Sequence, residues 1–220
     1  MNLVGEAWWH RYKVFIREAL GHLHFFREVY RLLAEKGGMD QVIVSAGDVK
    51  GLLDGVDGLL GDGADALLLK QALTQTIGTT LPRLMQHGDF CVRNVLIAGG
   101  ERGRVLIDWE DLQERRWPLA DFVLLRLSLK EVYASLFAAD LAAMERLPAL
   151  TEGLLAAEAE LMQILNLDST AMRAAQVLSL ACLCRQNLGK GRLDTARAIF
   201  GELMTCVRAN LETPAARAVS

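Results

Sequence analysis

The chain has 220 residues, of which 52% are apolar and 23% charged, so it resembles a globular protein with a buried core rather than a disordered or fibrous one. Its formal net charge of -3 gives no electrostatic reason to expect nucleic acid or an anionic membrane as a partner, although local basic patches are compatible with that value. No apolar run reaches the roughly 18 residues of a membrane span, and no signal peptide is recognisable. The four cysteines lack paired C-x-x-C spacing, which is typical of reduced thiols. We therefore expect a cytoplasmic protein.

The first predicted element is one long helix that ends at Gly37 and Gly38, because paired glycines are typical of a helix C-terminus. Apolar side chains recur along it at steps of three and four, which predicts one buried stripe rather than a ligand-binding box. The stripe consists of Trp8, Tyr12, Phe15, Ala19, Leu23, Phe26, Tyr30 and Leu33.

A short apolar run at 42–44 is followed by a stretch rich in glycine and aspartate from Gly47 to Asp65. Its aspartates do not occupy the alternating positions of an EF-hand loop, and it lacks the G-x-x-x-x-G-K-[ST] phosphate-loop motif. We predict a polar surface turn between helices here, with a ligand-binding loop as the alternative. A further helix is predicted from Ala64 to Ile77.

Two short aliphatic runs, Asn94–Ala98 and Arg104–Asp108, are separated by a glycine-rich turn and predict a β-hairpin. Beyond Pro118 the pattern is helical again, and Asp168 is suited to cap one of these helices while Gly189 and Gly191 would end it. The predicted helices cover about 119–138, 140–165, 169–188 and 193–211. The expected fold class is α+β, mainly α.

The polar residues best suited to chemistry flank this predicted hairpin. Because a hairpin brings its two ends together, Asn94 and Asp108 can meet at one edge. Two oxygen ligands, supplemented by phosphate oxygens and water, are what Mg²⁺ prefers. A third acidic residue, Asp89, lies on an irregular loop and is free to face a substrate hydroxyl. This layout is typical of phosphoryl transfer.

Three landmarks carry a resemblance to a known family: H-G-D-x-x-x-x-N from His87 to Asn94, I-D-W-E from Ile107 to Glu110, and P-x-x-D ending at Asp121. Together they resemble the aminoglycoside phosphotransferase and choline-kinase branch of the protein-kinase-like fold. The resemblance is close from Leu81 to Leu125 and looser in the flanking helices. It implies ATP- and Mg²⁺-dependent transfer of a phosphoryl group to a hydroxyl of a small molecule.

The resemblance also implies a role for each residue of the motif. Asp89 would be the catalytic aspartate that binds the acceptor hydroxyl, while Asn94 and Asp108 would hold Mg²⁺ between the nucleotide phosphates. Arg93 would contact a phosphate, with a solvent-exposed arginine as an equal alternative. An acidic rim favouring a cationic acceptor, with a solvated surface as the alternative, would consist of Glu110, Asp111 and Glu114.

Two further motif residues are expected to support the site without touching substrate. His87 would brace the catalytic loop from inside, and Asp121 would bond back to loop amides. Gly88 occupies the position at which protein kinases carry an arginine that binds a phosphorylated activation loop. Trp109-Glu110 replaces the Phe-Gly of the D-F-G motif. Both departures favour a small-molecule kinase over a regulated protein kinase.

The resemblance implies one kinase-like C-terminal lobe across the chain, divided into leading helices (1–80), a catalytic and metal-binding segment (81–125), a helical subdomain (126–211) and a tail (212–220). Kinase-like enzymes also need an N-terminal lobe with a β-sheet and a glycine-rich loop. The residues before His87 are mostly helical in pattern, so we expect that lobe to be absent. It could belong to a longer chain or a partner protein, or the chain could be a relic. The alternative functions are a lipopolysaccharide-sugar kinase of the same fold and a non-catalytic interaction module.

Overall fold

A computed structural model describes residues 3–59, 63–98, 103–138, 144 and 146–212. The chain divides into two compact units that interleave along the sequence. Unit 1 comprises Met1–Gly38, Met85–Glu114 and Asp121–Asn166, and unit 2 comprises Met39–Leu84, Arg115–Ala120 and Leu167–Ser220. The described residues are mainly helical with small sheets, as the sequence predicts.

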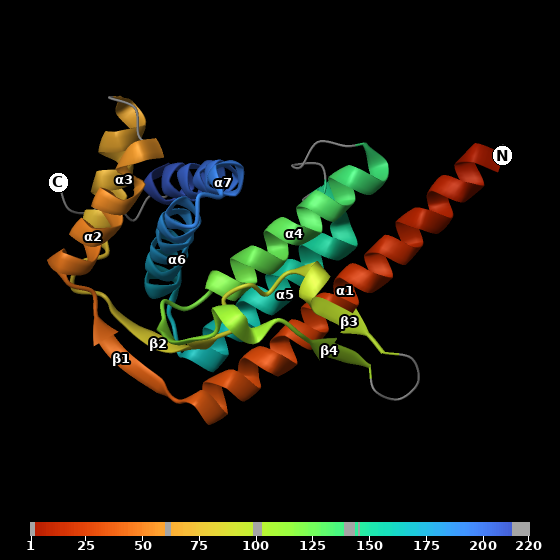
Figure 1. Cartoon of the computed structure of the whole chain (residues 1–220), viewed down its shortest axis with the longest axis horizontal. Helices are drawn as coiled ribbons and strands as arrows, with labels where there is room; N and C mark the ends of the chain where they lie inside the picture. The colour runs from red at the N-terminus through yellow and green to blue at the C-terminus, as the bar shows by residue number, and fades with distance from the viewer. Residues whose placement is uncertain (1–2, 60–62, 99–102, 139–143, 145, 213–220) are drawn as a thin grey trace. The chain divides into compact units, whose positions relative to one another are not determined.

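Unit 1 is a group of long helices that carries a short β-hairpin (Figure 1). The long first helix α1 (Leu3–Gly37) packs against α5 (Pro148–Leu165), and α4 (Ala120–Phe137) lies alongside them. The hairpin consists of β3 (Val95–Ile97) and β4 (Arg104–Leu106). Two single turns flank it, η2 (Val92–Asn94) before β3 and η4 (Trp109–Asp111) after β4.

The middle of the apolar stripe of α1 forms the core of unit 1, as predicted, but at its N-terminal end Trp8 is exposed, contrary to the prediction of one buried stripe. Phe26 is fully buried and lies 5.0 Å from the ring of Phe90 and 5.6 Å from that of Phe122, measured between centroids. On the side towards α5, both Arg27 and Arg31 form ion pairs with Glu160. The other buried stripe residues are Phe15, Ala19, Leu23 and Tyr30.

The predicted hairpin is confirmed, since β3 and β4 pair antiparallel with Val95 opposite Leu106. Residues 99–102 of its predicted turn lie outside the described residues. Arg104 of β4 forms an ion pair with Glu18 of α1, with 2.9 Å between nitrogen and oxygen. A Cβ atom at Gly21 would lie 2.2 Å from the Arg104 guanidinium, so glycine allows this close approach. The hairpin is thereby anchored on α1.

Unit 2 is built around the buried helix α6 (Ser169–Gly189), which packs against α7 (Leu193–Glu212), α2 (Ala46–Val56) and α3 (Ala64–Gln75) (Figure 1). Asp168 caps α6 as predicted, accepting a hydrogen bond from the backbone N–H of Ala171. Within the described residues, no helix has the length and hydrophobicity needed to cross a membrane.

A three-stranded sheet has the order β1 (Met39–Ile43), β2 (Thr80–Gln86), β5 (Gln113–Arg116), with β1 and β2 antiparallel. In unit 2 the Arg83 guanidinium of β2 lies 4.1 Å from the ring centroid of Trp117 and pairs with Asp48 at 2.8 Å. The sequence did not predict β2 as a strand, because Pro82 lacks the N–H that a central strand normally donates.

The predicted surface turn from Gly47 to Asp65 is wrong, because this stretch contains helix α2 and a following turn, η1 (Asp57–Leu59). Ser45 and Asp48 form a capping box, in which each side chain bonds the backbone N–H of the other residue. The apolar residues Val49, Leu52 and Val56 then share a buried face. The glycines and aspartates interspersed among these residues obscured this helical spacing.

The second predicted helix beyond Pro118 also starts too early. The structure begins α5 at Pro148 instead of residue 140, with Leu147 in an extended conformation at the N-cap. Proline suits the first helical turn, where its missing N–H would have no partner in any case. Residues 139–143 and 145 lie outside the described part of the chain.

The capping box provides a direct test of α2. We expect Ser45→Ala to lower the free energy of unfolding by about 1 kcal/mol, because it leaves the Asp48 N–H without its side-chain acceptor. Urea denaturation followed by circular dichroism measures the change. Ser135→Ala, which removes an exposed hydroxyl within α4, is the matched control and should have little effect. Equal stability of the two variants would contradict the observed cap.

Candidate functional site

A buried carboxylate holds the start of the H-G-D loop. Asp121, in the first turn of α4, accepts hydrogen bonds from the backbone N–H groups of His87 at 2.6 Å and Gly88 at 2.8 Å. Its own N–H donates to the side-chain oxygen of Gln86 at 2.9 Å. Gln86, His87 and Asp121 are essentially inaccessible to solvent. Bonds from amides to an ionised group are strong, so they define where the loop leaves β2.

The ring of His87 links this loop to the end of the hairpin. Its Nδ1 accepts the N–H of Asp89 at 3.3 Å, and its Nε2 lies 2.9 Å from the carbonyl oxygen of Ile107. Because the N–H can only donate and the carbonyl can only accept, the ring must carry its proton on Nε2. The indole of Trp109 packs edge-on at 4.7 Å between centroids and further restricts the ring.

Asp89 and Asn94 are in direct contact. The side-chain nitrogen of Asn94 donates to the carbonyl oxygen of Asp89 at 2.9 Å and to its carboxylate Oδ2 at 3.1 Å. Both partners are acceptors, so the amide group must present its nitrogen to Asp89. The side-chain oxygen of Asn94 therefore points away from Asp89 and remains suited to another ligand.

Asp108 follows a residue whose backbone contacts Asn94. The N–H of Ile107 donates to the carbonyl oxygen of Asn94 at 2.9 Å, so Asp108 is one residue beyond a backbone contact with Asn94. Asp108 is exposed, and its carboxylate forms no hydrogen bond or ion pair with any described residue. Its backbone is left-handed, with φ 63° and ψ 64°. Aspartate and asparagine adopt this conformation more readily than most residues other than glycine.

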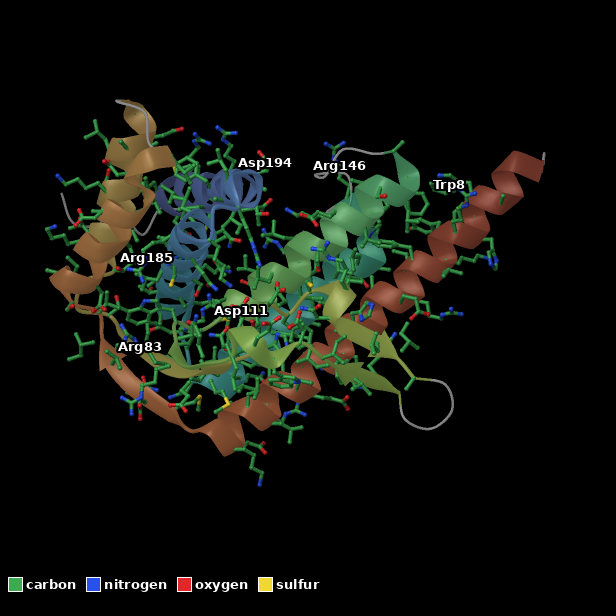
Figure 2. The ribbon with its side chains drawn as sticks, in the orientation of Figure 1. Trp8, Arg83, Asp111, Arg146, Arg185 and Asp194 are labelled. Carbon is green, nitrogen blue, oxygen red and sulfur yellow. The ribbon has the colours of Figure 1, made fainter. Side chains whose placement is uncertain are left out.

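Gly88 is required by the close approach of η4. Its φ of +89° lies in the left-handed region, and a Cβ atom would lie 2.0 Å from the carbonyl oxygen of Asp111. Figure 2 labels Asp111 in the turn that follows the hairpin. Any side chain at position 88 would push this turn, which begins directly after Asp108, away from the loop.

The remaining predicted residues lie near the same loop and turn. Arg93 follows the loop in η2 and is exposed, as are Glu110 in η4 and Glu114 in β5. Their side chains form no hydrogen bond or ion pair with described residues. Asp111 is half-buried instead and has an interacting partner. The structure thus brings Asp89 and Asn94 into contact and leaves four of the other charged side chains accessible, those of Arg93, Asp108, Glu110 and Glu114.

Sequence reasoning missed two residues that support the loop. Gln86 bonds the N–H of Asp121, and the hydroxyl of Ser128 accepts the N–H of Val92 at 3.1 Å while donating to the carbonyl of Leu125 at 2.9 Å. Ser128 gave little signal, because the charged residues Arg126 and Lys130 lie two positions away on either side and the segment is not uniformly apolar. Gln86 gave none, since its burial depends on the tertiary fold.

The donors at this site suit magnesium. The side-chain oxygen of Asn94 and the carboxylate of Asp108 are hard oxygen ligands, and Mg²⁺ commonly binds one or two such groups and completes its shell with water and phosphate. In the part of the chain that the structure describes, no group of three or more His, Cys, Asp or Glu side chains could hold a metal ion. A two-ligand oxygen set fits Mg²⁺ better than it fits zinc, which takes three or four nitrogen or sulfur ligands.

The sequence from 46 to 152 matches the model of the phosphotransferase enzyme family. This segment contains every predicted site residue from His87 to Asp121, and the match confirms the predicted resemblance to that family. Among solved structures, the chain matches a glucosamine kinase (crystal form B) at 16% identity and a TM-score of 0.46. The match covers 89% of this chain and 52% of that kinase, so the chain spans about half of its length. No curated protein matches the sequence.

The requirement for glycine at position 88 is testable. We expect Gly88→Ala to destabilise the protein by more than about 1–2 kcal/mol, the cost of a left-handed alanine alone, because its Cβ also collides with the Asp111 carbonyl. Gly38→Ala is the matched control: its φ is +74° and nothing lies within 4 Å of the added Cβ. Thermal unfolding of both variants measures the difference. An equal loss in the two variants would show that η4 does not press on the loop.

Proposed function

We propose that the chain is an ATP- and Mg²⁺-dependent phosphotransferase that acts on a hydroxyl group of a small molecule. The observation that carries the proposal is the contact between Asp89 and Asn94. Asp108, whose carboxylate bonds no described residue, lies one residue beyond the backbone bond to Asn94. The match of residues 46–152 to the phosphotransferase enzyme family supports the proposal.

Asp89 is the proposed catalytic residue. Asn94 donates a hydrogen bond to Oδ2 of Asp89, while Oδ1 of Asp89 accepts no hydrogen bond from a described residue. Oδ1 would accept a hydrogen bond from the acceptor hydroxyl, orient its oxygen towards the transferred phosphorus and take up the proton as the new O–P bond forms. A general base of this kind contributes about 10²- to 10⁴-fold to the rate. The hydrogen bond that the Asp89 N–H donates to the ring of His87 would keep the Asp89 carboxylate in position.

Asn94 and Asp108 are the proposed ligands for Mg²⁺, which when bound would neutralise negative charge on the nucleotide phosphates. Asn94 then has two roles, since its nitrogen positions Asp89 and its oxygen faces the metal. The exposed Arg93 is proposed to contact a phosphate. ATP is the proposed donor, which agrees with the cytoplasmic location expected from the sequence.

The other motif residues are proposed to shape the site. His87 and Asp121 would support the loop through the hydrogen bonds already described. An acidic rim of Glu110, Asp111 and Glu114 would favour an acceptor that carries positive charge, because those side chains add negative potential beside the hydroxyl site.

We further propose that the chain is a kinase-like C-terminal lobe. Its parts would be leading helices in 1–80, the catalytic and metal-binding segment in 81–125, helices in 126–211 and a tail in 212–220. The described residues before His87 form only two strands, β1 and β2, besides helices. A lobe that covers the nucleotide would therefore come from a longer chain or from a partner protein.

Calorimetric titration of ATP with and without Mg²⁺ tests the proposed metal site. We expect metal-dependent binding to the wild-type chain and its loss in Asp108→Asn. The variant should be as stable as wild type without ligand, because the carboxylate bonds no described residue and asparagine tolerates the left-handed backbone as well as aspartate does. Glu110→Gln removes the same charge two residues away and should retain binding. A large loss of stability in Asp108→Asn, with no binding by either protein, would contradict the site and favour a non-catalytic module.

The role of Asp89 has its own test. We expect Asp89→Asn to bind Mg²⁺-ATP with nearly unchanged affinity, since the amide oxygen can still accept the bond from Asn94. Transfer to hydroxyl acceptors should fall by about 10²- to 10⁴-fold, because an amide cannot take up the proton. ADP formation with a panel of amino sugars and amino alcohols measures the rate. Undiminished turnover in this variant would rule out Asp89 as the base.

A further inference from the structure

The N-terminal part of α1 carries an aromatic cluster that the proposed site does not use. Trp8 stacks on Tyr12, with 5.4 Å between centroids and 8° between planes, and contacts Phe137 of α4 at 5.7 Å. Trp9 lies edge-on to both Trp8 and Tyr12 at 5.5 Å. Figure 2 labels Trp8 near the N-terminal end of α1. The rings hold one another in place before any partner binds.

This cluster is exposed although its residues are large and apolar. Trp8 is 44% exposed and Trp9 48%, while Tyr12 and Phe137 are half-buried beneath them. Farther along the same stripe, Phe15 is only 5% exposed. The apolar face of α1 therefore extends beyond the part of the helix that the core covers. Neighbouring exposed residues of this size indicate a surface that binds a partner. Trp is well suited to a boundary between water and an apolar phase, because its ring is apolar and its N–H is polar.

Basic side chains flank the aromatic cluster. Lys13 and Arg17 follow Trp9 at intervals of four residues and so continue its edge of the helix, and Arg11 lies on the other side of the stripe. Arg11 and Lys13 are exposed and form no ion pair with a described residue. Arg17 is exposed too, and it forms an ion pair with Glu18 at 2.9 Å. The first 18 residues hold three basic and two acidic side chains, a net charge of +1 in a chain of net -3. The average charge of the chain hides this local excess.

The basic side chains around the aromatic cluster indicate which class of partner this face would bind. A second copy that bound through the same face in a symmetric dimer would place these basic groups against their own counterparts. Nucleic-acid-binding domains are usually strongly basic overall, whereas this chain has an isoelectric point near 5.8. An anionic bilayer satisfies both features, since its headgroups attract the basic side chains and its interface accepts the tryptophan rings.

We infer that the exposed face around Trp8, Trp9, Lys13 and Arg17 binds the surface of an anionic lipid bilayer. The helix lies against the interface and does not span it, so the binding is peripheral and salt-sensitive. This property goes beyond phosphoryl transfer and does not depend on it.

Co-sedimentation of the whole chain with vesicles tests the inference. We expect binding to vesicles of phosphatidylcholine mixed with phosphatidylglycerol, weak binding to phosphatidylcholine alone, and release by salt. Lys13→Gln should lower the partition coefficient about fivefold, and Trp9→Ser about tenfold. The matched controls lie towards the other end of α1: Lys36→Gln and Leu32→Ser, the latter at a residue that is 54% exposed, should bind as wild type does. Circular dichroism checks that each variant is folded.

Three outcomes would overturn the inference. The first is equal binding to both kinds of vesicle, or to neither. The second is self-association in sedimentation velocity without lipid that Trp9→Ser abolishes, which would assign the face to a second copy of the chain. The third is displacement from anionic vesicles by single-stranded DNA through direct binding to the protein, which would assign it to nucleic acid.

Discussion

The candidate site depends on one buried carboxylate. Asp121 receives the amides of His87 and Gly88, and these two bonds determine the direction in which the loop leaves β2. A charge so deeply buried is costly unless strong donors surround it, and backbone amides cannot rearrange without moving the chain. The position of the loop is therefore coupled to the first turn of α4.

A continuous series of hydrogen bonds extends from this anchor to the exposed end of the site. The ring of His87 joins Asp89 to Ile107, and the backbone of Ile107 joins Asn94. Asp108 thus follows a residue, Ile107, whose backbone carbonyl and N–H are both held by hydrogen bonds. Support of this kind allows Asp108 to keep a left-handed backbone although its side chain bonds none of the residues that the structure describes.

The long helix α1 serves several purposes along its length. Its middle fills the core of unit 1 through Phe26, and Glu18 anchors the hairpin through Arg104, beside His22. Burial, together with the positive charge of Arg104, lowers the pKa of His22, while Glu18 opposes the shift, so the ring is neutral near pH 7 and adds no second positive charge beside Arg104. Toward its N-terminal end the same apolar stripe emerges into solvent at Trp8. A periodic pattern predicts which face of a helix is apolar, but only the neighbouring elements decide where that face is covered.

The sequence by itself determined the long helix, the hairpin and the cluster of motif residues, because helical periodicity, glycine turns and short-range spacing are local properties. It failed at α2, where only the burial of the apolar face separates a helix from a polar turn, and at β2, where partner strands outweigh the proline. Tertiary structure alone decided the contact of Asn94 with Asp89 and the brace from Gln86 to Asp121. The physical reason is that a hydrogen bond between side chains or loops depends on distances of a few ångströms, which sequence spacing does not specify once the chain turns.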